Sequence, residues 1–203
     1  MSRSIALEPV SWQRMAEGIE NVKNRLDRAA AALSAVGVRY AVVGGNAVAA
    51  WVSRVDAAAV RNTRDVDIML RREDMECART ALEAAGFVHR RVASLGKGGA
   101  MDVFLESPEA KVRDAVHIWW AGEKAVPDAI ELTPELERTE EGDGFALIPL
   151  EDLVRMKLTS FRDEDRMHLR DLLAVGLVNE DWPRRFPTVL GERLQRILDD
   201  PEG

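Results

Sequence analysis

The stretch YAVVGGNAVAAWVSRVDAAAVRNTRDVDIML, residues 40–70, decides the fold that we expect for this chain. It begins with an apolar run over residues 40–43, which predicts a buried strand. Gly44 and Gly45 follow, and residues 46–53 predict a helix that starts at the glycine turn. Glycine lets a backbone approach a ligand closely, and a helix N-terminus offers free N–H groups to a phosphate. We therefore expect Gly44, Gly45 and Asn46 to bind a nucleotide.

A second strand is predicted where the same stretch ends, at Asp65-Val66-Asp67-Ile68. Successive side chains of a strand point to opposite sides, so Asp65 and Asp67 share one side while the apolar residues anchor the strand in the core. Two carboxylates on one side can hold one or two Mg²⁺ ions, which prefer oxygen ligands. This is the metal arrangement that phosphoryl-type transfer requires.

A strand ending in Gly-Gly, a helix, and a strand carrying Asp-hydrophobic-Asp-hydrophobic resemble the core of the nucleotidyltransferase superfamily, which has the DNA polymerase β fold. Aminoglycoside nucleotidyltransferases and the toxin nucleotidyltransferases of abortive-infection systems are nearest in pattern. The matching core covers residues 38–70, with weaker support to residue 175. The resemblance implies an α+β fold, in which a mixed sheet carries flanking helices and a C-terminal helical extension.

The resemblance also implies an activity. Such an enzyme moves an NMP from an NTP, for example ATP, to a hydroxyl group with the help of Mg²⁺, or of Mn²⁺, and releases pyrophosphate. The acceptor is a tRNA 3′ end, a protein side chain or a small molecule, and a toxin would have an antitoxin protein as its partner. If the third metal ligand has been lost, the same fold would instead give a non-catalytic nucleotide-binding or interaction protein.

A third metal ligand is expected on a neighbouring strand, because two metal ions need a shared ligand and the attacking hydroxyl needs a base. Asp114 begins the segment DAVHIWW, which resembles the third-carboxylate strand of some aminoglycoside enzymes, and it is the preferred metal ligand beside Asp65 and Asp67. His117 stands at the strand centre where an aspartate would be expected, and a neutral imidazole can ligate a metal or act as a base. Asp102, between apolar neighbours on an earlier strand, is a further alternative, as is the lack of any third ligand.

The segment LVRMKLTSFRDEDRMHLRDL, residues 153–172, resembles the helical segment after the catalytic core in the abortive-infection toxins. In that family a helix lysine meets the nucleotide phosphates. The resemblance therefore assigns Lys157 to phosphate contact, and Asp165 and Asp171 to support of the site or of the next helix. A solvated charged helix face, with Asp171 paired to an arginine, is the alternative for the two aspartates.

The rest of the chain predicts helices and strands around this core. Residues 11–36 predict an amphipathic helix ended by Gly37, and we expect its apolar face to pack on the domain; that face comprises Met15, Ile19, Val22, Leu26, Ala29, Leu33 and Val36. Further helices are predicted over residues 74–85, on both sides of residues 162–163, and over 189–198. Strands at 87–95, 100–106 and 115–122 are expected to add antiparallel to a mixed sheet, and the acidic residues 125–144 to form a surface loop or linker. We divide the chain into a nucleotidyltransferase core, residues 1–124, and a linker with a C-terminal helical extension packed on it, residues 125–203.

Composition sets the outer limits. The chain has 203 residues, 46% of them hydrophobic and 31% charged, which is typical of a globular protein. Its formal net charge of −7 argues against a broadly basic nucleic-acid coat protein, although Arg61, Arg64, Arg71 and Arg72 bracket the aspartate pair and either suit phosphates or lie solvated at strand ends. The single cysteine excludes an internal disulfide. We see no membrane span and no secretory signal, and we expect a cytoplasmic protein without a membrane partner.

Overall fold

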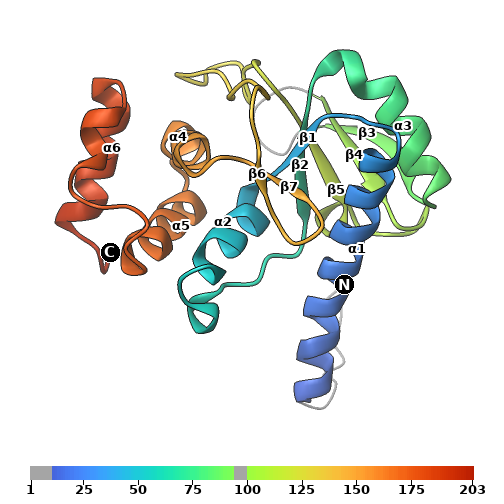
Figure 1. The fold of residues 1–203 in the computed structure, drawn as a ribbon, viewed down its shortest axis with the longest axis horizontal. Helices are drawn as coiled ribbons and strands as arrows, with labels where there is room; N and C mark the ends of the chain where they lie inside the picture. The colour runs from blue at the N-terminus through green and yellow to red at the C-terminus, as the bar shows by residue number, and fades with distance from the viewer. Residues whose placement is uncertain (1–10, 94–99) are drawn as a thin grey trace, which may run out of the picture.

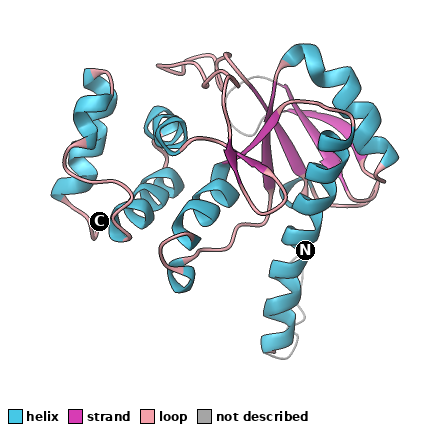
Figure 2. Cartoon of the chain, viewed as in Figure 1, coloured by secondary structure: helices cyan, strands magenta, loops and turns pink. Residues whose placement is uncertain are grey.

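The computed structural model describes residues 11–93 and 100–203, in which helices flank a seven-stranded mixed sheet (Figures 1 and 2). The helices are α1 (Trp12–Ala35), α2 (Gly44–Ser53), α3 (Met75–Ala84), α4 (Leu150–Ser160), α5 (Asp163–Ala174) and α6 (Thr188–Asp199). The strands are β1 (Tyr40–Val43), β2 (Val66–Leu70), β3 (Val88–Ala93), β4 (Ala100–Leu105), β5 (Val116–Trp120), β6 (Glu140–Glu141) and β7 (Ala146–Leu147). The predicted α+β class is confirmed. The expectation about a secretory signal in residues 1–10, and the last two residues of the strand predicted at 87–95, lie outside the described residues.

The order of strands in the sheet is β3-β4-β5-β2-β1-β7-β6. The predicted antiparallel pairing is confirmed for β3 with β4 and for β4 with β5. It is wrong for β5 and β2, which are parallel, because the long connection through α3, β3 and β4 returns the chain to the end of the sheet at which β2 begins. β1 runs antiparallel to β2, so the end of β1 meets the beginnings of β2 and β5.

Helix α1 divides into two halves. In its second half Leu26, Ala29 and Leu33 are buried, and this half packs on α3, β2 and β5. Gly37, with a φ of 69°, ends the helix as predicted. The first half extends beyond the sheet (Figure 1), and Met15 and Ile19 are exposed. The expectation that the whole apolar face packs on the domain is therefore wrong for Met15 and Ile19, because the helix extends beyond the sheet there.

The C-terminal third of the chain is joined to the sheet as well as to the helices. Helices α4, α5 and α6 pack on one another, and α2 packs on α4 and α5 (Figure 2). The β6–β7 hairpin adds to the sheet through Leu147, which pairs with Val42 of β1. Within residues 125–144, which we expected to be a surface loop or linker, Leu136 is buried in the main core. One hydrophobic core thus contains residues from both sides of the predicted boundary at residue 124.

None of the described helices is both long and apolar enough to cross a membrane. Even α1, at 24 residues, lacks a sufficiently apolar stretch to cross a bilayer.

Candidate metal centre

Three polar side chains meet where the end of β1 adjoins the beginnings of β2 and β5. Asp67 is the second residue of β2, and in the register of the sheet it lies opposite Val43 of β1 and His117 of β5. Residues in register on neighbouring strands point to the same side, and Asp65 shares that side because it precedes Asp67 by two residues. One ligand atom from each of Asp65, Asp67 and His117 lies within 4.8 Å of the others. The sheet register therefore brings together the predicted aspartate pair and one of the alternative third ligands.

The imidazole of His117 is oriented by a backbone carbonyl. Its Nε2 lies 2.7 Å from the carbonyl oxygen of Val112, which can only accept, so Nε2 carries a proton. In the neutral ring Nδ1 then presents a lone pair to the two carboxylates, at 3.5 Å from Asp65 Oδ2 and 3.6 Å from Asp67 Oδ1. Two ligand atoms that each lie about 2.1 Å from one ion are at most about 4.2 Å apart. The spacing and the tautomer both fit a shared cation.

The pKa shifts of Asp67 and His117 show that this group of side chains attracts positive charge. Burial raises the pKa of Asp67, but His117, when Nδ1 also carries a proton, and Trp119, whose Nε1 donates to Oδ1 at 2.9 Å, lower that pKa further than burial raises it. Burial lowers the pKa of His117, but Asp67, the Val112 carbonyl and Asp65 raise it by more. The two ionised carboxylates attract positive charge to the position beside Nδ1. A proton on Nδ1 and a metal ion compete for that position.

Asp65 is held in place by its neighbours on three elements. Thr63 Oγ1 donates to Asp65 Oδ1 at 2.6 Å, and Asn46 Nδ2 of α2 donates to the Asp65 carbonyl oxygen at 2.6 Å. The buried Arg25 of α1 donates to the carbonyl oxygen of Arg64 at 2.8 Å. These contacts fix the backbone just before β2 and leave Oδ2 directed toward His117. Asn46, predicted as a nucleotide ligand, therefore makes a structural contact at the site.

The two glycines play different parts. Gly44 has a φ of 65°, a conformation that favours glycine, and a Cβ added there would overlap the carboxylate of Asp67. A Cβ at Gly45 would approach Thr63 Cβ to 3.0 Å, a tight contact but less severe than the overlap at Gly44. Helix α2 begins at Gly44, so its free N–H groups adjoin the carboxylate pair. Gly44 makes room for the carboxylate of Asp67, a role that the sequence did not indicate.

Asp114 and Asp102, the other candidates for the third ligand, lie elsewhere. Asp114 ends the short turn before β5, and its Oδ1 accepts from Arg64 Nη2 at 2.9 Å and Nε at 3.2 Å. Asp102 faces the opposite side of the sheet, because its neighbour Val103 is the residue in register with His117. The Asp102 carboxylate contacts His89 Nε2 at 2.8 Å on that side. The structure places neither aspartate in the group with Asp65 and Asp67.

Lys157 lies in a second polar cluster, between α4 and α5. Its Nζ donates to Asp165 Oδ1 at 3.1 Å, and both side chains are buried. The other carboxylate oxygen of Asp165 accepts from Ser160 Oγ and from the backbone N and Nε of Arg162. Burial raises the pKa of Asp165, but these donors outweigh it and lower the pKa to about 2. The positive charge of Lys157 also lowers the pKa of Asp67, so the cluster lies within electrostatic reach of the metal group.

Trp119 and His168 lie near the site and carried no clear signal in the sequence, whereas Asp171 was named there. Trp119, which holds Asp67, follows His117 by two residues and so shares its side of β5, a periodicity that could have identified it. His168 of α5 is buried, its Nδ1 has no hydrogen-bond partner, and burial together with the charge of Lys157 lowers its pKa to about 4. Asp171 pairs with Arg61 at 2.8 Å, as the alternative interpretation of that aspartate expected.

The arginines that bracket the aspartate pair in the sequence all have acidic partners. Arg61 contacts Asp171, Arg64 contacts Asp114, Arg71 contacts Glu73 and Arg72 contacts Glu123. Much of the positive charge predicted around the site is therefore neutralised within the chain.

Comparison with known proteins rests on structure, since no family model and no curated protein sequence matches the chain. The crystal structure of an antigenic nucleotidyltransferase-like protein from Paracoccidioides brasiliensis superposes with a TM-score of 0.53 and 17% identity, over 90% of this chain and 90% of that chain. The chain has a nucleotidyltransferase fold. The resemblance seen in the sequence is thereby confirmed.

Two structures of the antibiotic-resistance factor ANT(2'')-Ia share this nucleotidyltransferase fold. Its solution structure matches with a TM-score of 0.51 and 15% identity, over 87% of this chain and 90% of that chain. Its crystal structure in complex with adenylyl-2''-tobramycin matches with a TM-score of 0.50 and 17% identity, over 88% of this chain and 99% of that chain. At such identities the likeness concerns the fold.

Proposed function

We propose that this chain is a metal-dependent nucleotidyltransferase that moves an NMP from an NTP to a hydroxyl acceptor. The observation that carries the proposal is the convergence of Asp65, Asp67 and Nδ1 of His117 beside the glycine start of α2. The nucleotidyltransferase fold supports it. A structural salt-bridge cluster would not need two carboxylates to face one imidazole whose other nitrogen is already committed to a carbonyl.

The donor set fits a divalent cation that accepts both oxygen and nitrogen ligands. We propose that Asp65, Asp67 and His117 hold it, with Mn²⁺ bound more readily than Mg²⁺ because imidazole suits Mn²⁺ better. When bound, such an ion stabilises the charge that develops on the transferring phosphoryl group and activates the attacking hydroxyl. The Val112 carbonyl keeps the Nδ1 lone pair available, and Trp119 orients Asp67.

The remaining residues of the site would bind and orient the substrates. The unpaired N–H groups at the start of α2, which includes Gly44 and Gly45, would bind the triphosphate. Lys157, fixed by Asp165, would contribute a positive charge at a set position. Asp65 is the more accessible carboxylate, with 34% of its side chain exposed against 13% for Asp67. We infer that the acceptor hydroxyl approaches from the side of Asp65.

The acceptor is proposed only by class. ANT(2'')-Ia was crystallised with an adenylylated tobramycin, so a small molecule with free hydroxyls is one candidate. A tRNA 3′ end and a protein side chain are the others, and an antitoxin partner belongs to the toxin-like version of the proposal. An acceptor RNA would have to approach a chain with a net charge of −7, which favours a small or locally bound acceptor.

A non-catalytic nucleotide-binding protein is the second candidate, and one observation favours it. An imidazole stands where a third carboxylate was expected, and a proton on His117 can satisfy both aspartates without a metal ion. The two candidates differ in whether a phosphoanhydride bond is ever broken.

The test is transfer of α-phosphate-labelled NTP, with Mg²⁺ or Mn²⁺, into RNA, protein and metabolite fractions. The proposal expects label in one fraction, its loss with Asp67→Asn, and its retention with Asp163→Asn, which changes an exposed carboxylate on α5. Nucleotide binding without transfer into any fraction, for all four NTPs and both metals, would establish the non-catalytic alternative.

A further inference from the structure

The exposed first half of α1 carries a regular apolar stripe. Trp12, Met15 and Ile19 are 85%, 58% and 48% exposed, and the partly buried Val22 follows. The stripe continues into the buried residues Leu26, Ala29 and Leu33, and throughout it the spacing alternates strictly between three and four residues. Such alternation is the a and d pattern of a helix that pairs with another helix. Leu26, Ala29 and Leu33 of this stripe belong to the core of the domain, whereas Trp12, Met15 and Ile19 are left exposed.

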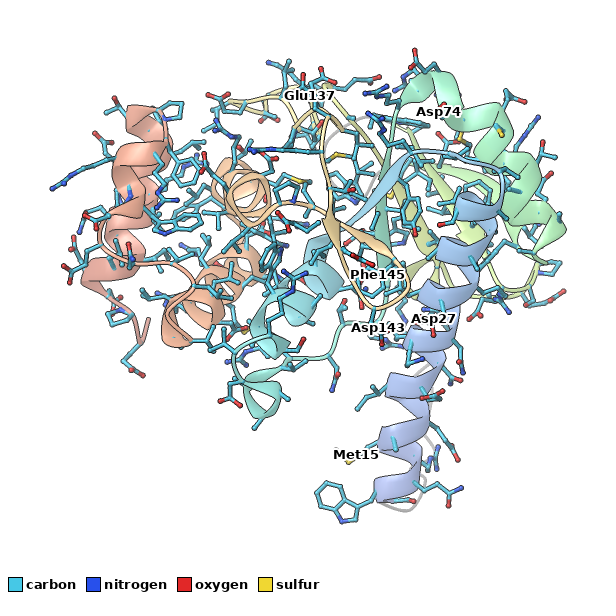
Figure 3. The ribbon with its side chains drawn as sticks, viewed as in Figure 1. Met15, Asp27, Asp74, Glu137, Asp143 and Phe145 are labelled. Carbon is cyan, nitrogen blue, oxygen red and sulfur yellow. The ribbon has the colours of Figure 1, made fainter. Side chains whose placement is uncertain are left out.

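A cavity opens beside the middle of the same stripe. It has a volume of about 170 Å³, and its walls include Ile19, Val22 and Leu26 of α1 together with Phe145. The carboxylates of Asp27 and Asp143 also line it, and Figure 3 shows these two residues and Phe145 gathered beside α1. The rest of the lining is mostly polar, and it comprises Ala49 with Lys23, Asn46, Arg61, Asn62 and Thr63. The apolar part of the wall suits the large body of an indole ring, and the carboxylates suit its single N–H donor.

We propose that two copies of this chain associate through an antiparallel pair of α1 helices, with Trp12 of each copy in the cavity of the other. About a two-fold axis near residue 17, Trp12 lies opposite Val22 of the second copy, and Met15 lies opposite Ile19. Each layer then pairs an a residue with a d residue, as an antiparallel pair requires, and Val22 lines the cavity that receives the indole.

The stripe is complementary to itself, which is why the partner is a second copy. Trp12 and Val22 are ten residues apart, about 15 Å along a helix, so one antiparallel overlap fills both cavities at once. The flanking residues beside the axis, Ala16 and Gly18, are small and permit close approach of the helices. A parallel pair would instead set Trp12 against Trp12 and leave both cavities unfilled.

The first test is sedimentation equilibrium of the whole chain from about 1 to 300 μM. Because the interface is small, we expect a dimer with a micromolar dissociation constant. Trp12→Ser should weaken the dimer at least about tenfold, since a buried Trp is a typical hot spot. Val189→Ser is the matched control, because Val189 is 54% exposed on α6, outside the stripe. A monomer at every concentration, or a dimer that Trp12→Ser leaves unchanged, would overturn the proposal.

A second test fixes the direction of the pair. In a Cys77→Ser background, which removes the one native, exposed thiol, chains with Met15→Cys are mixed with chains carrying Ile19→Cys. Antiparallel pairing predicts that the mixed disulfide forms faster than either symmetric one, as measured by intact mass. Preferential Met15→Cys homodimers would contradict the antiparallel register. Both positions are exposed, so unchanged thermal unfolding of the variants checks that the fold is retained.

Discussion

Two polar groups of this protein lie within electrostatic reach of each other and are built in opposite ways. The closed group comprises Lys157, Ser160, Arg162 and Asp165. Donors from the first three residues surround the carboxylate of Asp165, whose side chain is 1% exposed. The open group, Asp65, Asp67 and His117, sets two carboxylates against one imidazole. Charge that is compensated within the chain serves the fold, whereas charge that is left uncompensated indicates a site for a cation.

The connection between α4 and α5 explains how the closed group forms. Phe161 adopts a left-handed conformation, with a φ of 49°, so the chain reverses within one residue and α5 starts at Asp163. This brings Asp165 back onto Lys157, and the Arg162 side chain completes the ring of donors. The closed group thereby holds the charge of Lys157 at a fixed place near Asp67.

The largest effect that separates the two groups is expected from Asp67→Asn. We expect transfer activity to fall about a thousandfold, equivalent to about 4 kcal/mol, because a charged ligand leaves the open group. The free energy of unfolding should fall by less than in the closed group, because Trp119, His117 and Lys157 stabilise the charge of Asp67 only to the extent that its lowered pKa shows. Activity assays and urea unfolding on one preparation measure both quantities. Full activity in a folded variant would show that the open group is not the catalytic site.

The corresponding change in the closed group should act on stability. Asp165→Asn leaves the buried ammonium of Lys157 without its counter-charge, and we expect a loss of about 3 to 5 kcal/mol in the free energy of unfolding. Asp163→Asn, at an exposed position two residues earlier, should change it by less than about 0.5 kcal/mol. Urea denaturation measures both. If the two variants proved equally stable, Asp165 would not be the structural anchor that its contacts indicate.

His168 lies close enough to the closed group for the charge of Lys157 to affect its pKa, and it predicts how the free energy of unfolding depends on pH. Its pKa in the folded chain is about 4, below the ordinary value of 6.5, because burial and Lys157 disfavour the imidazolium. As the pH falls from 6.5 toward 4, the unfolded chain takes up a proton that the folded chain does not. The free energy of unfolding should therefore fall by roughly 3 kcal/mol over this range. His168→Gln should make the free energy of unfolding depend less steeply on pH over this range than in the wild type. An unchanged dependence would show that His168 is not the group responsible.

A smaller effect on activity is expected from substitutions of Gly44 and Gly45, whose backbone adjoins the open group. Gly44→Ala would push the Asp67 carboxylate from its position and force an alanine into a left-handed conformation, so we expect a loss of activity of about 10- to 100-fold. Gly45→Ala, which approaches only Thr63, should cost less. Steady-state rates for the two variants decide the order. Equal losses would mean that the glycines serve only the turn.

The smallest effect is predicted for Asp114→Asn. Its carboxylate pairs with the exposed Arg64 and lies outside the open group, so activity should change by less than about twofold. A loss as large as that of Asp67→Asn, again from steady-state rates, would return Asp114 to the metal site.

The sequence predicted the centre of the fold because its signals are local. Strand β1, the glycine turn and the alternating Asp65 and Asp67 are each determined by neighbours within a few residues. The third ligand depends instead on how β5 aligns with β2, and a shift of one residue exchanges the two sides of a strand. Asp114 and His117 are an odd number of positions apart, so they cannot share a side of one strand, and only the register selects His117.

Helix α1 shows the same limit in another form. Periodicity predicted its bounds and its apolar face, but periodicity does not record how far the neighbouring elements extend. Met15 and Leu26 belong to one stripe, yet only Leu26 is covered by the sheet and α3. The donors around Asp165 were equally invisible to the sequence, because they depend on the left-handed turn at Phe161.

The central claim, that the open group is a metal site completed by His117, is tested most directly by pulsed electron paramagnetic resonance of bound Mn²⁺. The wild type should bind Mn²⁺ and show electron spin echo modulation from one directly coordinated imidazole nitrogen. That modulation should disappear with His117→Gln, and binding itself should be lost with Asp67→Asn. Bound Mn²⁺ without nitrogen coupling in the wild type, or binding that survives Asp67→Asn unchanged, would contradict the account.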